Sequence, residues 1–316
     1  MIYILFIVGF VLLIAGARYF VDGAVSMGIR ARLSPLVIGL TVVAFGTSLP
    51  ELVVNIFAAF KGSTGLAIGN VLGSNIVNIL GVIGITALIF PFHVDRPSMR
   101  RDLPFGIFVT FLLLFMGNGY FLGFAKTVTR LEGLLMLLIF GAYLAWLMRS
   151  GDTPDEASEY KNKQADSIPV TALMLIGGLA GMYFGGEWVS DGAIHIANVL
   201  GISEGAIGLT IVAFATSLPE LATSIVAALK KNVGIVMGNV LGSNIINILI
   251  VLGTTAVIKP ISMPLDMNVE IVMVMLANIA LLLAVKIGHG LHLSRREGGV
   301  LLALYLGFLV FSVYFN

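Results

Sequence analysis

The sequence GTSLPE at residues 46–51 decides the fold, because it returns as ATSLPE at residues 215–220. Each copy lies inside an apolar segment long enough to cross a bilayer. A glutamate at membrane depth is costly and usually marks the path of an ion or substrate. The proline before it lacks an N–H and presses on the carbonyl four residues back, so it breaks the helix and frees backbone oxygens. Carbonyls, two hydroxyls and a carboxylate within six residues form the oxygen-rich site that calcium and sodium prefer.

The composition around these motifs is that of a membrane protein. Of the 316 residues, 58% are hydrophobic and 11% are charged, whereas a soluble domain carries about 25% charged residues. Ten apolar runs are long enough to be spans, at residues 2–26, 35–60, 65–90, 102–118, 128–148, 169–190, 204–229, 233–258, 268–286 and 298–315. We therefore predict an all-α polytopic membrane protein with ten transmembrane helices. The first run lacks the basic leader of a signal peptide, so we expect it to be a retained helix.

The charges indicate compartment and orientation. A net charge of +1 gives no sign of a nucleic-acid partner, and the absence of cysteine excludes disulfides and thiolate metal sites. With the N-terminus outside, the inner loops hold thirteen lysines and arginines and the outer loops hold four. The positive-inside rule then places both termini outside. We expect a multi-pass protein of a prokaryotic cell membrane, with the lipid bilayer around it and no protein partner implied.

The two motifs belong to a longer internal repeat. Residues 37–86 align without gaps on residues 206–255, and 32 of the 50 positions are identical. The copies begin five spans apart, so they cross the membrane in opposite directions, as in many secondary transporters. The alternative is that the duplication records only how the bundle evolved, but that would not keep Thr, Ser, Pro and Glu inside the membrane.

The repeat also predicts the domain organisation. We expect two inverted five-helix repeats with broken helices 2 and 7. They would cover residues 1–149, with the motif region at 35–90, and residues 169–316, with the motif region at 204–258. The polar segment 150–168 would be a cytoplasmic linker.

A second motif follows in each copy, GNVLGSNIVN at residues 69–78 and GNVLGSNIIN at residues 238–247. Asn70, Ser74 and Asn78 fall at i, i+4 and i+8, so they form one polar stripe on a helix. The glycines form GxxxG and favour close helix packing. We favour cation binding, over a role only in helix packing, for Ser74, Asn78, Ser243 and Asn247. Each stripe would face the glutamate of its own repeat.

The two repeats together predict one cation site. It combines the carboxylates of Glu51 and Glu220 with hydroxyl, amide and carbonyl oxygens. The hydroxyls come from Thr47, Ser48, Thr216 and Ser217, further oxygens from Ser74, Asn78, Ser243 and Asn247, and backbone carbonyls from Ala44 and Ala213. Two ionised carboxylates neutralise one divalent cation, and calcium takes six to eight oxygens.

The paired motifs strongly resemble the α-repeats of the sodium/calcium exchanger family, within the cation/calcium antiporter superfamily. The resemblance implies antiport of calcium against sodium through four clustered sites, without a cofactor and without an enzymatic reaction. It implies that Glu51 and Glu220 hold calcium with the carbonyls of Thr47 and Thr216. Sodium would use the Ala44 and Ala213 carbonyls with Thr47, Ser48, Ser74, Thr216, Ser217 and Ser243, and Asn78 would sit at the centre.

Two positions depart from the family pattern. Many sodium-for-calcium members carry Asp where this chain has Asn247, and Ala215 replaces a glycine. Two sodium ions per calcium would balance the two glutamates. An Asp beside two carboxylates tends to stay protonated, however, and Asn resembles a protonated Asp in shape. We therefore favour three-for-one, electrogenic exchange, with two-for-one exchange as the alternative.

Other functions fit the residues less well. In proton/calcium antiporters of the same superfamily, the second motif resembles GNxxE. At the position of that glutamate this chain has Gly73 and Gly242. A channel is disfavoured because broken helices in inverted repeats are typical of alternating access. An intramembrane hydrolase is disfavoured because both carboxylates are Glu, each follows Pro, and no loop motif supports hydrolysis.

Overall fold

The computed structural model describes residues 2–120, 126–149, 164–199, 213–263, 267–287 and 290–315. The first half holds α1 (Ile2–Ala31), α2 (Pro35–Ile38), the π-helical segment η1 (Gly39–Val43), α3 (Ala44–Thr47), α4 (Leu49–Lys61), α5 (Thr64–Ile76), the π-helical segment η2 (Val77–Val82), α6 (Ile83–Ile89), β1 (Phe92–His93), the π-helical segment η3 (Ser98–Asp102), α7 (Leu103–Gly117), β2 (Thr127–Val128) and α8 (Arg130–Arg149). The second half holds α10 (Ile168–Val199), α12 (Ala213–Thr216), α13 (Leu218–Leu229), α14 (Val233–Ile246), the π-helical segment η6 (Asn247–Leu252), α15 (Gly253–Ile258), β3 (Ile261–Ser262), α16 (Met267–Ile287), β4 (His292–Leu293) and α17 (Arg295–Phe315).

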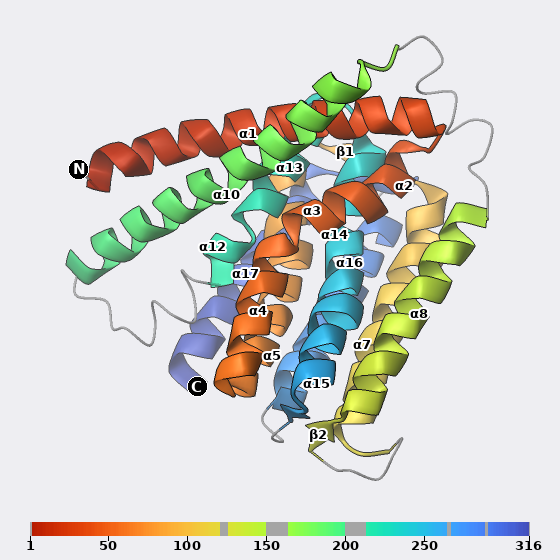
Figure 1. The fold of residues 1–316 in the computed structure, drawn as a ribbon, viewed down its shortest axis with the longest axis vertical. Coiled ribbons are helices and arrows are strands. Elements are labelled where there is room, and N and C mark those ends of the chain that lie inside the picture. The colour runs from red at the N-terminus through yellow and green to blue at the C-terminus, as the bar shows by residue number, and fades with distance from the viewer. Residues whose placement is uncertain are drawn as a thin grey trace.

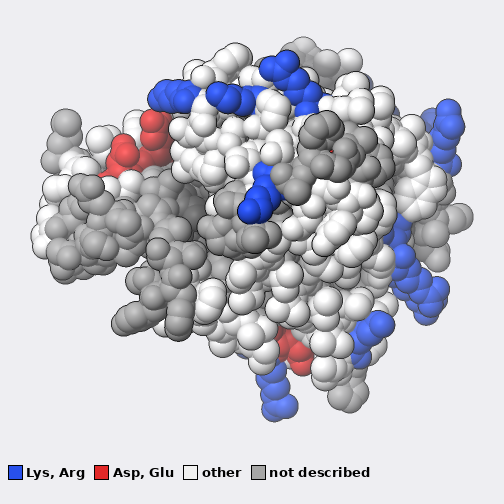
Figure 2. Space-filling view, turned by 90° about the horizontal axis from the view of Figure 1, so that it is seen from below, with Lys and Arg blue, Asp and Glu red and all other residues white. Residues whose placement is uncertain are grey.

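The molecule is a helical, multi-pass membrane protein, as predicted. Within the described ranges, six helices are long and apolar enough to cross a membrane, or seven with one bent pair counted as a span. Apolar side chains point outward, as for Phe60 and Leu173, which are 73% and 72% exposed. An outward-facing apolar surface of this kind suits lipid, because in water large apolar patches would associate. Figure 2 looks at the end of the bundle where β2 lies, and there lysines and arginines are seen mostly toward the edge of the view.

Helix is present in each of the ten predicted spans. The segment 204–212, which begins the predicted seventh span, and most of the linker, residues 150–163, lie outside the described residues. The predicted break in the second span is present. The helices Pro35–Thr47 and Leu49–Lys61 meet at 46°, with Pro50 in the first turn of α4. In the second copy, α12 ends at Thr216 and α13 begins at Leu218.

Two long helices, α1 and α10, cross the rest of the bundle at a steep angle (Figure 1). They have 30 and 32 residues, about 45 Å at 1.5 Å per residue, which exceeds the roughly 30 Å hydrocarbon core and suits a strong tilt. Glycines let them approach closely. A Cβ added at Gly16 would lie 2.8 Å from the Gly178 carbonyl, and one at Gly178 would lie 2.8 Å from the Gly16 carbonyl.

Two short antiparallel strand pairs tie the halves of the chain together. β1 pairs with β4, and β2 pairs with β3. The residues of β1 and β3 are 169 positions apart, the offset of the internal repeat. In Figure 1, β1 lies at one end of the bundle and β2, with its partner β3, lies at the other. Equivalent strands of the two halves therefore lie at opposite ends of the molecule.

Candidate cation site

The helix breaks place both glutamates at the start of a new helix. Glu51 is the third residue of α4, and Glu220 is the third residue of α13. Both residues are fully buried. The N-terminus of a helix carries partial positive charge, which favours a carboxylate there. The local fold thus lowers the cost of holding negative charge inside the bundle, although no cationic side chain is recorded bonding to either carboxylate in the described chain.

Glu220 joins predicted site residues from both halves. Its Oε1 accepts hydrogen bonds from the Ser48 hydroxyl and the Ser243 hydroxyl, each at 3.4 Å. Ser48 ends the first half of the broken helix α2–α4, and Ser243 lies on α14. The expected contact between the Ser243 stripe and the glutamate of its own repeat is therefore present.

The two threonines pair with serines across the repeats. Thr47 Oγ1 lies 3.4 Å from Ser243 Oγ, and Thr216 Oγ1 lies 3.3 Å from Ser74 Oγ. Each broken helix thus meets the second motif of the other half. The first asparagine of each stripe bonds within its own half, Asn70 to Asn55 Oδ1 at 2.9 Å and Asn239 to Ser224 Oγ at 3.1 Å. These two bonds fit the alternative that the stripe holds helices together.

The first backbone hydrogen bonds at the breaks are recorded in both halves. The Ala44 carbonyl accepts the Ser48 N–H at 3.0 Å, and the Phe214 carbonyl accepts the Ser217 N–H at 3.1 Å. Ala213, the predicted counterpart of Ala44, begins α12.

The amides of Asn78 and Asn247 lie in the π-helical segments η2 and η6, and both residues are fully buried. Asn78 Nδ2 donates to Asn244 Oδ1 at 3.2 Å, and Asn247 Nδ2 donates to Asn75 Oδ1 at 3.1 Å. Sequence reasoning missed Asn75 and Asn244. Their signal was available, because GSN recurs in both motifs and places an unassigned polar residue beside each serine.

Buried oxygen atoms without a hydrogen-bond partner mark the site. Among the described residues they are Glu51 Oε1 and Oε2, Glu220 Oε2, Asn78 Oδ1, Asn247 Oδ1, Ser217 Oγ and Thr86 Oγ1. All but Thr86 Oγ1 belong to predicted site residues. A buried acceptor left unpaired costs about 1–3 kcal/mol, and more when it is charged. A cation that binds through oxygen would supply what these atoms lack.

The donor set suits a hard cation. No group of three or more His, Cys, Asp or Glu side chains forms among the residues that the structure describes. Two carboxylates with neutral hydroxyl and amide oxygens resemble calcium and sodium ligands more than the imidazole and thiolate ligands of transition metals.

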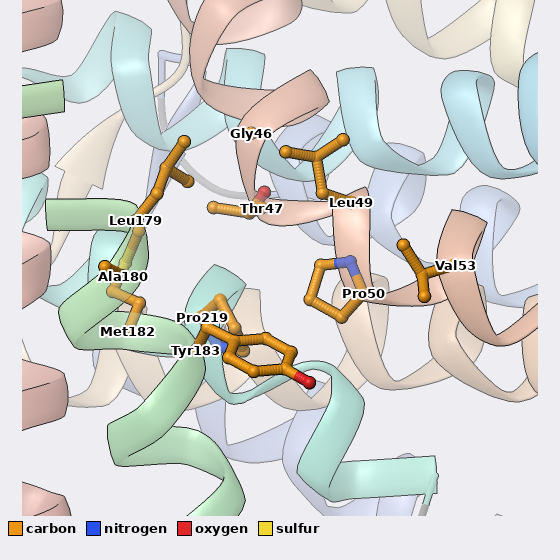
Figure 3. A pocket seen from close by; sticks show the side chains of 10 residues that line it. All are labelled: Gly46, Thr47, Leu49, Pro50, Val53, Leu179, Ala180, Met182, Tyr183 and Pro219. Atoms are coloured by element: carbon orange, nitrogen blue, oxygen red, sulfur yellow. The ribbon is translucent and has the colours of Figure 1, made fainter. Parts of the chain in front are cut away.

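An apolar pocket of about 240 Å³ lies beside the breaks (Figure 3). Pro50 and Pro219 line it from the two broken helices, and Leu179 and Tyr183 line it from α10. The Thr47 residue of the site also contributes to its wall. The long tilted helix α10 therefore lies next to the broken helices that carry the two carboxylates.

Comparison with known proteins identifies the family. The sodium/calcium exchanger protein family matches residues 1–149 and 170–314. The chain is 40% identical over 97% of both chains to the putative antiporter CaxA of Alkalimonas amylolytica. It is 27% identical to the Ca(2+)/H(+) antiporter ChaA of Bacillus subtilis, over 96% of this chain and 90% of that one.

A solved structure shows the same fold. The sodium-calcium exchanger NCX_Mj superposes with a TM-score of 0.80 at 31% identity, covering 99% of this chain and 97% of that one. The family match spans nearly the whole chain, including both motif regions. The protein therefore belongs to the sodium/calcium exchanger family, whose members are membrane transporters and not enzymes.

Proposed function

We propose that this protein exchanges calcium for sodium across the cell membrane by alternating access. The observation that carries the proposal is the set of buried, unpartnered oxygen atoms contributed by Glu51, Glu220, Asn78, Asn247 and Ser217. A molecule that buries two carboxylates and leaves neutral oxygens without donors is stabilised by a cation in their midst.

The ligand roles follow from charge. Calcium would bind between Glu51 and Glu220, whose two charges balance it, with the carbonyls of Thr47 and Thr216. Sodium would bind where neutral oxygens predominate. Those ligands would be the Ala44 and Ala213 carbonyls with Thr47, Ser48, Ser74, Thr216, Ser217 and Ser243, around the central Asn78. The hydroxyl pairs that join Thr47 to Ser243 and Ser74 to Thr216 support this assignment, because they already bring ligands from both halves together.

The same proposal includes the architecture. We infer ten spans in two inverted repeats, residues 1–149 and 169–316, joined by a cytoplasmic linker at 150–168, with both termini outside. Reciprocal bonds between Asn75 and Asn244 support an approximate two-fold relation, because the two residues are equivalent in the repeat. The equivalent strand pairs at opposite ends of the bundle support the inversion (Figure 1).

Calcium/proton exchange is the second candidate, because the relative ChaA is named a Ca(2+)/H(+) antiporter. In proton/calcium antiporters the second motif resembles GNxxE, which ends in a glutamate. This chain has Gly73 and Gly242 at that position of the two motifs. That lack of an additional carboxylate favours sodium as the counter-ion.

Purified protein in sodium-loaded liposomes tests the proposal. An outward sodium gradient should drive uptake of radioactive calcium, and a proton gradient of equal size, without sodium, should not. Uptake driven only by protons would assign the protein to the second candidate, and no uptake under either gradient would reject exchange altogether.

Charge movement tests the stoichiometry. At set sodium and calcium gradients, three-for-one exchange has a reversal potential, the membrane voltage at which net transport stops. This voltage changes when either gradient is changed. We expect this electrogenic behaviour, because Asn247 stands in for a protonated Asp. An equilibrium that is independent of membrane potential would show two-for-one exchange instead.

A further inference from the structure

Four asparagine side chains form a closed network where the two halves meet. Asn75 Nδ2 donates to the Asn244 carbonyl at 3.2 Å, and Asn244 Nδ2 donates to the Asn75 carbonyl at 3.2 Å. Asn247 and Asn78 then donate to the Oδ1 atoms of Asn75 and Asn244, at 3.1 and 3.2 Å. All four residues are buried. The network lies at the ends of α5 and α14, where each helix passes into a π-helical segment.

The backbone carbonyls fix the polarity of this network. A carbonyl oxygen only accepts hydrogen bonds, so the end of the Asn75 amide that faces the Asn244 carbonyl must be its NH₂ group. The Oδ1 of Asn75 is then the atom that faces Asn247. An oxygen needs a donor, so Asn247 must turn its own NH₂ toward Asn75. Its Oδ1 is left at the far end, where it is buried and has no hydrogen-bond partner in the described chain.

The half of the network that ends at Asn78 has the same polarity. The Asn75 carbonyl orients the Asn244 amide, the Asn244 Oδ1 takes the NH₂ of Asn78, and Asn78 Oδ1 remains unpartnered. Both ligand amides therefore end with oxygen, and not nitrogen, available to a cation. An amide turned the other way would present N–H groups, which repel a cation.

We propose that Asn75 and Asn244 are positioning residues that hold the Asn78 and Asn247 amides with oxygen toward the transported ion. The inference rests on the proposed cation exchange. It adds that position 247 requires a hydrogen-bond donor toward Asn75, because a carboxylate oxygen there would face the Asn75 Oδ1. An amide or a protonated carboxyl meets this requirement, and an ionised carboxylate does not.

Transport kinetics of the variants Asn75→Leu and Asn75→Asp in liposomes test the positioning role of Asn75. Leucine removes both ends of the amide, whereas aspartate keeps an oxygen toward the Asn247 NH₂ and loses only the NH₂ that bonds to the Asn244 carbonyl. Asn75→Leu should raise the KM for sodium and calcium at least about tenfold, the size expected for a lost buried hydrogen bond, with a smaller change in maximal rate. Asn75→Asp, which keeps the acceptor for Asn247, should raise the two KM values less. Asn278→Asp is the matched control, since its buried amide also donates to a backbone carbonyl, that of Val274, at 2.8 Å. It should leave both KM values unchanged.

A double-mutant cycle separates positioning from packing. If Asn75 acts through Asn247, the KM of Asn75→Leu combined with Asn247→Ala should equal that of Asn247→Ala alone, because residues in one network are not additive. Additive effects, or a wild-type KM for Asn75→Leu, would overturn the inference. Detergent-solubilised variants with wild-type melting temperatures establish that the fold is kept.

A binding measurement distinguishes failure of this inference from failure of the proposed function. Calcium should raise the melting temperature of the wild-type protein in detergent, and Asn75→Leu should need at least about tenfold more calcium for the same rise. If this difference between wild type and Asn75→Leu is found but there is no sodium-driven flux, the function fails and the inference stands. If calcium stabilises wild type and Asn75→Leu equally, the inference fails alone, and if calcium stabilises neither, both fail.

Discussion

The two halves of the chain match each other where α1 packs on α10 and differ where they enclose the glutamates. In the seam between the long helices, Gly9 and Gly16 are equivalent to Gly178 and Gly185, and each approaches a glycine carbonyl of the other helix. At the site, the hydroxyls of Ser48 and Ser243 donate to Glu220. Of the equivalent serines, Ser217 has no hydrogen-bond partner among the described residues, and Ser74 pairs with Thr216. Equivalent sequences thus make equivalent packing between the long helices but different serine contacts at the two glutamates.

If the two halves are inverted repeats, as we propose, alternating access requires such a difference. If both halves had identical surroundings, the site would face both sides equally, and access could not alternate. Packing by glycine backbones has one close geometry, while hydroxyls and amides can change partners at little cost. We expect the polar contacts, and not the seam contacts, to exchange between the halves during transport.

The largest expected effect is at the carboxylates, and it tests whether their different contacts imply different roles. Glu51→Gln and Glu220→Gln each remove one of two charges from the buried site, which costs about 3–5 kcal/mol. Calcium exchange in liposomes should fall more than about a hundredfold in either variant. Glu132→Gln is a control, because Glu132 is also buried but accepts bonds from Thr129 at the start of α8. A glutamine at 51 with near-normal exchange would show that only Glu220 carries calcium.

The next effect concerns the glycine seam, where the halves should respond equally. A Cβ at Gly185 would lie 2.5 Å from the Leu13 backbone nitrogen, and one at the equivalent Gly16 would lie 2.7 Å from the Met182 backbone nitrogen. Gly16→Ala and Gly185→Ala should each destabilise the protein by about 1–3 kcal/mol, as overpacking does. Thermal unfolding in detergent measures this loss. Gly177→Ala is the control, since its Cβ would meet nothing within 4 Å, and unequal losses at Gly16 and Gly185 would disprove the symmetry of the seam.

The serines at the breaks test the asymmetry of the site directly. Ser48 donates to Glu220, while the Ser217 hydroxyl has no partner among the described atoms. Without sodium or calcium, Ser48→Ala should lower stability by about 1 kcal/mol, and Ser217→Ala should leave it unchanged or raise it. Both should raise the KM for sodium, because both hydroxyls are proposed ligands. Equal melting temperatures for the two ion-free variants would argue against the different surroundings.

Much of the site could be predicted from sequence because the motif carries its own geometry. Proline before glutamate breaks the helix, and the break puts Glu51 and Glu220 at helix starts in the bundle interior. The sequence could not predict which glutamate receives the serine donors, because Ser48 and Ser217 both stand in a TSLPE motif. Asn75 and Asn244 were missed for another reason. They lie off the i, i+4 stripe, and only the packing of α5 against α14 across the repeats gives them partners.

The smallest effect concerns an ion pair that one half makes and the other does not. Lys230 at the end of α13 bonds to Asp22 on α1 at 2.6 Å. The equivalent residues are Lys61 and Asp191, and among the described residues they form no ion pair. By the proposed orientation, Lys230 lies on the inner side and Lys61 on the outer side. The described structure therefore has the inner pair closed, and we expect the outer pair to form when the site opens inward.

Charge removal on each side should bias the molecule in opposite directions. Asp22→Asn removes the inner pair, so it should favour the inward-open form, and Asp191→Asn should favour the outward-open form. Both carboxylates lie near solvent, with the Asp22 side chain 50% exposed, so each shift is limited to about 0.2–1 kcal/mol, or at most roughly fivefold in an equilibrium. The ratio of calcium KM values on the two faces of oriented vesicles measures the bias, and it should shrink at high ionic strength, which screens exposed charges. Lys231→Gln controls for general loss of positive charge beside Lys230. Shifts of the same sign for Asp22→Asn and Asp191→Asn would show that the pair does not alternate, and the asymmetry between the halves would then belong to the site alone.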